Sequence, residues 1–306
     1  MANFELHEIA FPTLTDAQIA QLGSCTAALG SSYAAGDVLV HFGDRDFKFF
    51  VVRSGEIEIL DQTGETPKTI AIHSRGEFTG DVSHLTGTAA IFTAVALSDC
   101  EVYAISGALI KQVINQCPDL GDIILRAFMA RRQLVRESGT FTGLRVIGSR
   151  YSPDTFRIRD FLAKNLVLFT WTDLEANPDV DQLLRHFGVT EADTPIVVCP
   201  EHMLRNPSNR DLADAVGIRK TFERTVYDLA VVGAGPAGLA AAVYGASEGL
   251  NTVVLERTAP GGQAGSSMRI ENYLGFPTGL TGSDLAERAV LQANKFGAVL
   301  SVPAQV

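Results

Sequence analysis

The sequence predicts a multidomain chain in which a strand-rich roll with flanking helices precedes two α/β units. Three observations support this. Short apolar runs alternate with turns from Tyr33 to Ile105, strands alternate with helices from residue 143, and after residue 226 a strand runs into a glycine-rich turn. The chain has 306 residues, of which 46% are hydrophobic and 20% charged, as in globular proteins with two or three domains.

The first unit, residues 1–138, is expected to run helix, strands, helix. Thr15 or Asp16 is a candidate N-cap for an early amphipathic helix. Short strands at regular spacing indicate a rolled or closed antiparallel barrel, and helical periodicity returns from Ser106 to Val135. The basic residues of this last segment are typical of the solvent-facing side of a helix rather than of a binding patch: Arg126, Arg131, Arg132 and Arg136.

The second unit, residues 143–222, follows the small-residue segment ESGTFTG, which predicts a linker at 137–143. Its apolar pattern reads strand, helix, strand, helix, strand and short helix, which indicates an α/β layer. The third unit, residues 226–306, begins with strand, glycine turn, helix and strand.

The glycine turn of the third unit is the clearest chemical motif. An apolar strand, Leu229–Val232, runs into Gly233-x-Gly235-x-x-Gly238 and then an alanine-rich helix. The first glycine allows the tight turn, the second lets a pyrophosphate approach the backbone, and the third lets helix and strand pack closely. A second strand ends at Glu256, where a carboxylate can accept hydrogen bonds from a ribose. The motif predicts dinucleotide binding; the alternative is a glycine-rich turn without a ligand.

The segment after Glu256 resembles the flavin domain of thioredoxin reductases. That family shows Gly-Gly-Gln followed by Ile-Glu-Asn-Tyr, present here as Gly261–Gln263 and Ile270–Tyr273, and the resemblance extends from about Val226 to Val306. It implies FAD as the cofactor, with the following candidate binding residues: Gly233, Gly235, Pro236, Ala237, Gly238, Glu256, Arg257, Gly262, Gln263 and Asn272.

The resembled family places an NADPH-binding domain with a redox CxxC pair inside the flavin domain, and this sequence contains neither. We therefore expect a truncated product, an engineered fragment or a degraded gene that is not catalytically competent alone. We expect the fragment not to retain FAD, and NADP only in a full-length relative. The implied partners are a thioredoxin-like protein or the missing NADPH-domain segment, and the resembled reductases are usually homodimers.

The second unit is similar to the thioredoxin and glutaredoxin fold. That family keeps a proline, usually cis, at the start of a strand beside its active cysteines, and Pro195 matches it. The Cys-Pro-x-Cys pattern would fall on Ser152 to Thr155, where both cysteine positions hold a hydroxyl residue. A hydroxyl cannot form the thiolate that exchange requires, so a docking or structural module is expected. The alternative is a redox role for Cys199.

The first unit resembles a cyclic-nucleotide-binding domain, because Gly76–Gly87 is similar to its phosphate-binding cassette. The resemblance points to Gly80, Asp81 and Val82 as candidate nucleotide-binding residues, with Asp81 in place of the ribose-binding Glu. The phosphate-binding Arg would align near Ala90, so a contact of roughly 1.5–3 kcal/mol is missing. Backbone N–H groups could still hold an anion. We expect a regulatory or oligomerising module with another ligand or none, and keep cAMP or cGMP as the alternative.

Composition excludes several other classes. The net charge of −10 without a basic stripe argues against nucleic-acid binding. The four cysteines (Cys25, Cys100, Cys117, Cys199) form no CxxC pair and have no metal-site spacing, and His41, His73 and His84 lie on separate segments. There is no signal peptide pattern and no apolar run of about 18 residues, so a cytoplasmic protein without a membrane role is expected.

Together these features predict an FAD-dependent, thioredoxin-disulfide-reductase-like oxidoreductase with an N-terminal regulatory domain. The alternative is a non-catalytic nucleotide-sensing or interaction protein that reuses the same folds.

Overall fold

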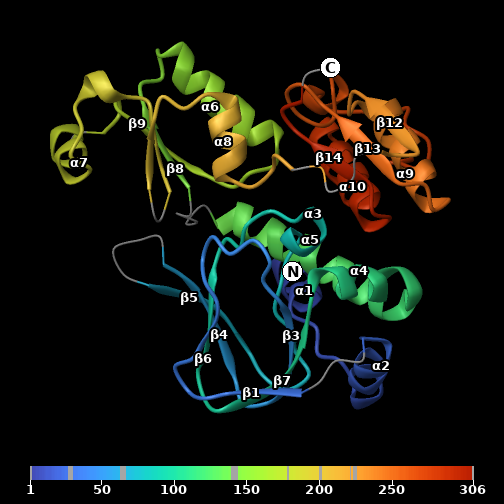
Figure 1. The fold of residues 1–306 in the computed structure, drawn as a ribbon. Helices are drawn as coiled ribbons and strands as arrows, with labels where there is room; N and C mark the ends of the chain where they lie inside the picture. The colour runs from blue at the N-terminus through green and yellow to red at the C-terminus, as the bar shows by residue number, and fades with distance from the viewer. Residues whose placement is uncertain are drawn as a thin grey trace. The chain divides into compact units, whose positions relative to one another are not determined.

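The computed structural model describes residues 2–26, 30–62, 67–138, 144–177, 179–199, 202–220, 222 and 226–304. The chain forms two compact units, residues 1–143 and residues 144–306 (Figure 1). Most of the predicted linker, residues 139–143, lies outside the described residues.

The first unit begins with helices α1 (Ala2–Ala10) and α2 (Asp16–Thr26). Thr15 caps α2 as predicted, because its Oγ1 accepts a hydrogen bond of 3.3 Å from the backbone N–H of Gln18. The strands and the short helix that follow are β1 (Gly30–Tyr33), β2 (Val38–Val40), β3 (Phe49–Ser54), β4 (Ile57–Asp61), β5 (Lys68–His73), α3 (Ser83–Thr86), β6 (Thr93–Ala96) and β7 (Cys100–Ile105).

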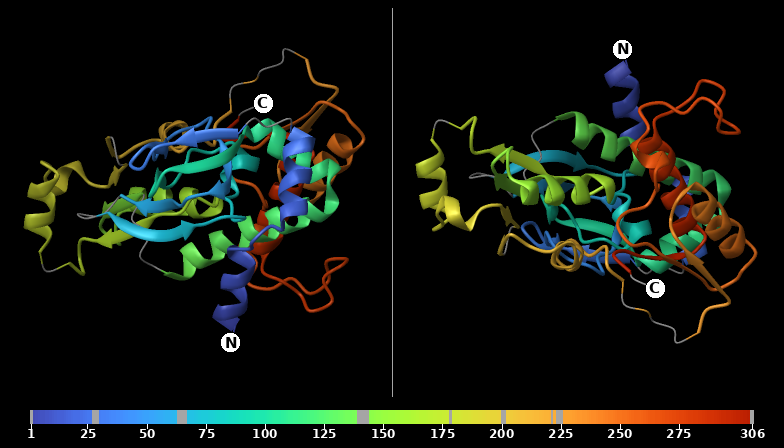
Figure 2. Two further views of the ribbon diagram at one scale, coloured as in Figure 1. Left: turned by 90° about the horizontal axis from the view of Figure 1, so that it is seen from below. Right: turned by 90° about the horizontal axis from the view of Figure 1, so that it is seen from above.

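These strands form two antiparallel sheets that share one core (Figures 1 and 2). The strand orders are β1-β7-β3 and β2-β6-β4-β5. Phe50 and Val52 from one sheet pack with Ile57, Ile59 and Ala94 from the other in a single buried cluster. The predicted antiparallel roll is therefore a two-sheet sandwich.

Two helices complete the first unit, α4 (Gly107–Gln116) and α5 (Pro118–Ser138). The Ser106 side chain caps α4 by accepting from the N–H of Leu109. The prediction that the basic residues of α5 face solvent is wrong for Arg131, and Arg132 is only half-exposed. Arg131 is buried and turns toward the sandwich, whereas Arg126 and Arg136 are exposed.

The second unit begins with a mixed four-stranded sheet in the order β11-β10-β8-β9. Strands β8 and β9 are parallel, and β10 runs antiparallel to both β8 and β11. The elements are β8 (Arg145–Gly148), α6 (Pro153–Lys164), β9 (Thr170–Asp173), α7 (Val180–His186), η1 (Glu191–Asp193), β10 (Ile196–Val198), β11 (Met203–Arg205) and α8 (Asn209–Ala215). Helices α6 and α8 bury Ile158, Phe161 and Leu212 against this sheet.

The last part of the second unit is a parallel sheet in the order β12-β13-β14, packed with α9 and α10. Its elements are β12 (Leu229–Val232), α9 (Pro236–Ser247), β13 (Thr252–Leu255), η2 (Ala264–Ser266), α10 (Gly282–Lys295) and β14 (Val299–Ser301). The Asn165 amide donates to the carbonyl of Thr258 over 3.0 Å, which links α6 to the segment after β13.

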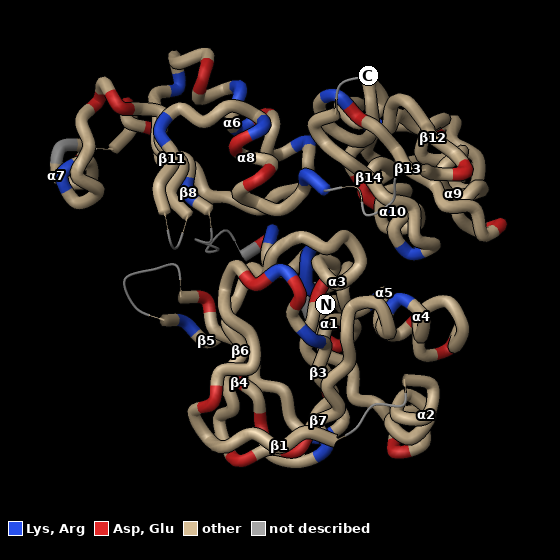
Figure 3. Tube along the Cα trace, in the orientation of Figure 1, with Lys and Arg blue, Asp and Glu red and all other residues tan. Residues whose placement is uncertain are grey.

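Acidic and basic residues are interspersed along both units (Figure 3). Within the residues that the structure describes, no helix has the length and apolar character that crossing a membrane requires.

Candidate functional site

The glycine turn between β12 and α9 has the geometry that its spacing predicts. Gly233 has a φ of +93°, which favours glycine, and its N–H donates to the carbonyl of Leu255 over 2.8 Å. A Cβ on Gly238 would collide with the Gly233 carbonyl oxygen, so the third glycine is needed for close packing. A Cβ on Gly235 would meet no atom within 4 Å. The space in front of Gly235 is therefore open.

Helix α9 begins at this open position. Gly235 is its N-cap and Pro236 its first residue, and no side chain caps the helix. First-turn N–H groups have no partner inside a helix, and the positive end of the helix dipole favours an anion there. The turn can thus receive a phosphate or pyrophosphate.

Glu256, directly after β13, is held by backbone donors from two segments. Its Oε2 accepts a hydrogen bond of 2.7 Å from the N–H of Ala234, inside the glycine turn. Its Oε1 accepts from the N–H of Thr258 over 2.8 Å and, at 3.4 Å, from that of Ala259. A carboxylate offers about four acceptor positions, so one remains for a ligand hydroxyl.

The Gly-Gly-Gln segment closes against the same turn. The N–H of Gly261 donates to the Ala234 carbonyl over 2.7 Å. A Cβ on Gly262, whose φ is +54°, would lie 3.1 Å from Cα of Gly235. Only a residue without a side chain lets these two backbone segments approach so closely.

The remaining predicted residues lie on the surface around this turn. Ala237, Arg257, Gln263 and Asn272 are exposed, and Pro236 is half-buried. The structure thus brings Gly235, Glu256 and Gly262 together around the turn. It leaves Gln263 and Asn272 as exposed side chains on the segments that follow.

A second candidate site is the cassette between β5 and β6 in the first unit. Gly80 has a φ of +100°, and the buried Asp81 uses its carboxylate to accept from the N–H of Ser83 over 2.8 Å. Ala90 is buried in the sandwich core, and its N–H donates to the carbonyl of Asp44. Neither Asp81 nor Ala90 presents a charged group to solvent at this cassette.

Arg131 of α5 hydrogen-bonds to the backbone of the cassette. The pattern of the sequence predicts that this residue faces solvent. Its guanidinium donates to the carbonyls of Gly80, Phe78 and Ala10 at 2.6, 2.8 and 2.8 Å. Burial lowers the pKa of Arg131 to about 10, so the group stays charged at neutral pH. The sequence carries one sign of this burial, because Arg131 lies within an otherwise apolar face of the helix.

Two buried histidines lie near Arg131. His84 packs against the rings of Phe47, Phe49 and Phe128, and burial lowers its pKa. Burial also lowers the pKa of His73 to about 3, and nearby Arg131 contributes. Both imidazoles are therefore neutral core residues. Among the described residues there is no cluster that could hold a metal ion.

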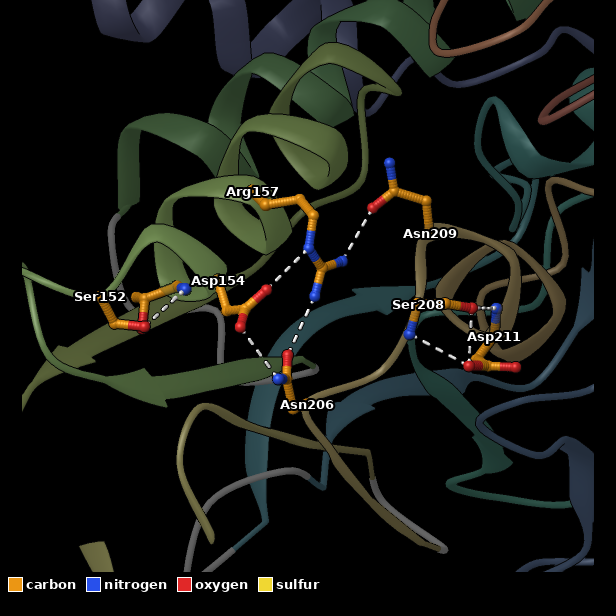
Figure 4. Close-up of polar contacts among 8 residues, drawn as sticks. Ser152, Asp154, Arg157, Asn206, Ser208, Asn209 and Asp211 are labelled. Atoms are coloured by element: carbon orange, nitrogen blue, oxygen red, sulfur yellow. Dashed lines mark hydrogen bonds and ion pairs between the residues drawn. The ribbon is translucent and has the colours of Figure 1, made fainter. Parts of the chain in front are cut away.

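A third candidate site is a polar network at the start of α6 (Figure 4). The Arg157 guanidinium donates to Asp154, Asn206 and Asn209 at 3.1, 2.9 and 3.0 Å. The Asn206 amide also donates to Asp154 over 3.0 Å, and the hydrogen bonds from Asn206 and Arg157 lower the pKa of Asp154. These polar side chains satisfy one another.

The two hydroxyl residues of this region differ in their surroundings. The Ser152 side chain caps α6 by accepting from the N–H of Thr155. The Thr155 hydroxyl is buried and has no hydrogen-bond partner among the residues that the structure describes. It lies close to Gly148 and to Pro195, which follows a cis peptide bond. The cis proline matches the prediction for Pro195.

Cys199 lies beyond this strand and packs against the apolar core of the sheet. Burial raises the pKa of its thiol to about 11. A thiol with this pKa is a poor nucleophile at neutral pH, which favours a packing role over a redox role.

Two family models match this chain, each at a different segment. Residues 31–117 match the family model of the cyclic nucleotide-binding domain, and residues 231–287 match that of the NAD(P)-binding Rossmann-like domain. Neither match extends over residues 144–230.

A quarter of the chain is also similar to curated thioredoxin reductases. It is 43% identical over 76 residues to the enzyme of Bacillus subtilis, covering 25% of this chain and 24% of that protein. It is 49% identical over 73 residues to the enzyme of Peptoclostridium acidaminophilum, covering 24% and 23%. This chain therefore spans about a quarter of the length of the curated relatives it matches.

Among solved structures, the atypical thioredoxin reductase TRi from Desulfovibrio vulgaris Hildenborough is 47% identical over 24% of each chain, with a TM-score of 0.23. The chain thus joins a cyclic nucleotide-binding domain to an NAD(P)-binding Rossmann-like segment, and about a quarter of its length is similar to part of the thioredoxin reductases.

Proposed function

We propose that this chain belongs to an FAD-dependent, thioredoxin-disulfide-reductase-like oxidoreductase that carries an N-terminal regulatory domain. The domains that we propose are residues 1–138, 143–222 and 226–306. One observation carries the proposal most directly. Gly235, Glu256 and Gly262 converge on one open glycine turn, and they do so within the Rossmann-like segment of a chain that is similar in part to thioredoxin reductases.

The residues around the turn fit the ADP half of a dinucleotide. The first turn of α9 would receive the pyrophosphate, and the open space at Gly235 lets it approach the backbone. The free acceptor position on Glu256 would take a ribose hydroxyl. Arg257, Gln263 and Asn272 are exposed where they could contact the rest of the cofactor. FAD, once bound, would supply the redox chemistry, since these residues carry no redox group themselves.

We further propose that residues 143–222 form a thioredoxin-like docking module without exchange activity. Support comes from the strand order β11-β10-β8-β9 and from the parallel pairing of β8 and β9. Ser152 and Thr155 would occupy the two thiol positions, and hydroxyl groups cannot replace thiolates there. The partner that we favour is a thioredoxin-like protein.

For the cyclic nucleotide-binding domain we propose a regulatory role in which Gly80, Asp81 and Val82, all buried here, are the candidate nucleotide-binding residues. The carboxylate of Asp81 already accepts from Ser83, and position 90 holds a buried alanine instead of an arginine. Binding of cAMP or cGMP should therefore be weak, because no guanidinium pairs with the cyclic phosphate.

Since we expect the chain to lose FAD during purification, the cofactor proposal is tested by adding FAD, ADP and FMN back to the purified chain in a titration calorimeter. FAD and ADP should bind with affinities within about tenfold of each other, because both carry the pyrophosphate and ribose that the turn recognises. FMN lacks the adenosine half and should not bind. Binding of FMN but not ADP, or binding of none of the three, would overturn the proposal.

A further inference from the structure

Two cysteines of the first unit lie side by side although they are 92 positions apart in the sequence. Sγ of Cys25 and Sγ of Cys117 are 3.0 Å apart. Cys25 lies on the last turn of α2, and Cys117 is the C-cap residue of α4, immediately before α5. A disulfide requires sulfur atoms about 2.05 Å apart, so the gap to be closed is about 1 Å.

The α2 side of this pair is held by contacts of its own. Leu22 is fully buried, and a Cβ on Gly23 would lie 3.1 Å from the ring of Tyr103 on β7. Close packing of α2 on the sandwich thus fixes where Cys25 lies, independently of its thiol.

The α4 side is equally fixed. The N–H of Cys117 donates to the carbonyl of Val113 over 2.9 Å, and its carbonyl accepts from the N–H of Gly121. A Cβ on Gly121 would collide with the backbone of Ile114, so the α4–α5 junction is tightly closed. Two separately packed segments therefore present their sulfur atoms to each other.

The other two cysteines have different surroundings. Cys100 is buried in the sandwich core, and Cys199 belongs to the second unit and packs on its sheet. Cys25 is exposed to solvent, whereas Cys117 is buried. The pair thus combines an exposed thiol with a buried one.

We propose that Cys25 and Cys117 form a reversible disulfide, by exchange with a small-molecule disulfide, that ties α2 to the α4–α5 junction. The Cys25 thiolate attacks one sulfur of the reagent RSSR, forms a mixed disulfide and releases one RS⁻. The Cys117 thiolate then attacks Sγ of Cys25 and releases the second RS⁻. The protons of the two protein thiols end on the two leaving groups. The protein gains one disulfide, and RSSR is reduced to two RSH.

In the reduced protein the hydrogen bond with Cys25 and burial raise the pKa of the Cys117 thiol. Only thiolates attack a disulfide, so the protein disulfide should form faster at pH 8.5 than at pH 6.

Oxidised glutathione is the probe for the test. The full chain is incubated with it, quenched in acid, unfolded and alkylated, and the thiols are counted by mass spectrometry. The reduced chain has four thiols, and the oxidised chain should retain two, those of Cys100 and Cys199. A digest should contain one pair of peptides, joined through Cys25 and Cys117, that separates on reduction.

Single substitutions sharpen the result. Cys117→Ser should stop at a glutathione adduct on Cys25, and Cys25→Ser should keep its three thiols. The matched control Cys199→Ser should still form the disulfide. If a variant fails to fold, the peptide map of the unaltered chain decides alone. Four retained thiols in excess oxidised glutathione, or linkage through Cys100 or Cys199, would overturn the proposal. The assay does not depend on FAD, so its outcome is separate from that of the proposed function.

Discussion

The carboxylate of Glu256 accepts a hydrogen bond of 2.7 Å from the backbone N–H of Ala234 and so ties the end of β13 to the glycine turn after β12. Glu256→Gln keeps the size of the side chain but offers one acceptor oxygen where the carboxylate offered two. We expect the free energy of unfolding to fall by about 2 kcal/mol, because a donor to a charged group loses its partner. Urea denaturation measures this.

The same substitution should weaken FAD or ADP binding at least tenfold. Glu248→Gln is the matched control, because Glu248 is an exposed carboxylate at the end of α9. If Glu256→Gln and Glu248→Gln have equal effects, the assigned role of Glu256 in the turn is wrong.

Gly235→Ala separates ligand binding from folding. A Cβ there meets nothing within 4 Å, and φ of −71° and ψ of 179° suit any residue. The free energy of unfolding should change by less than about 1 kcal/mol. FAD and ADP affinity should fall at least tenfold, because the new methyl group occupies the path of the pyrophosphate. Scanning calorimetry measures the change in stability, and titration calorimetry measures the affinity for FAD and ADP.

Gly107→Ala, at the first residue of α4, provides the control for Gly235→Ala, since its nearest contact is an ordinary 3.7 Å. It should leave binding unchanged. Unaltered ADP binding in folded Gly235→Ala protein would remove the turn from the proposed site.

The proposed thioredoxin-like module is tested by introducing thiols at its two candidate positions with Ser152→Cys and Thr155→Cys together. Ser152 caps α6, where the positive end of the helix dipole stabilises a thiolate. The double variant should form a new disulfide in oxidised glutathione and reduce it again in excess dithiothreitol. Alkylation and peptide mapping detect the 152–155 linkage.

Thr155→Val is the companion to that experiment. The Thr155 hydroxyl is buried without a partner among the described residues, so its replacement by a methyl group should raise the free energy of unfolding by about 1 kcal/mol. Failure of the double variant to close its disulfide while Thr155→Val folds normally would contradict the thioredoxin-like assignment.

The sequence predicts those structural features whose residues are close together in the chain. The roles of Gly233 and Gly238 follow from spacing, because the strand and helix that they join are adjacent in the chain. The Thr15 cap follows from its position just before an amphipathic segment. The sequence does not predict that Ala234 bonds to Glu256, since both could have faced solvent or ligand.

Contacts between distant segments could not be predicted. Arg131 lies among apolar residues at helical spacing, but that spacing does not identify the three carbonyls of the cassette and of α1 that the tertiary packing of α5 brings within reach. Cys25 and Cys117 have neither a short spacing nor a shared motif, so their proximity requires the tertiary fold.

The buried His73 predicts how stability depends on pH. Its pKa in the folded state is about 3, below the ordinary 6.5, so below pH 6.5 the unfolded chain binds a proton that the folded chain does not. Stability is therefore lost as the pH falls from about 6.5 toward 3. Between pH 7 and pH 5 this histidine should cost about 2 kcal/mol. His84, whose pKa burial also lowers, adds in the same direction.

Urea unfolding at pH 7 and pH 5 measures this loss, with His73→Gln as the comparison. Glu77, whose carboxylate lies 4.0 Å from Nδ1 of His73, and Arg131 are the charged groups that face it. The variant should lose less stability on acidification than the unaltered chain. Equal losses would show that His73 titrates normally.

The guanidinium of Arg131 on α5 donates to three carbonyls. Two belong to Phe78 and Gly80 in the cassette, and the third belongs to Ala10 at the end of α1. Arg131→Met keeps much of the side-chain volume but leaves three buried carbonyl oxygens without their donor. The free energy of unfolding should fall by about 3–5 kcal/mol, as for other buried charge networks that lose one member.

Arg126→Met, on the exposed face of the same helix, should cost less than about 1 kcal/mol. Arg131→Lys keeps the charge but not the planar fork, so it can satisfy fewer of the three carbonyls and should fall between the two. If Arg131→Met proves as stable as Arg126→Met, the hydrogen bonds of Arg131 do not stabilise the cassette. Its apolar contacts would then account for its stability.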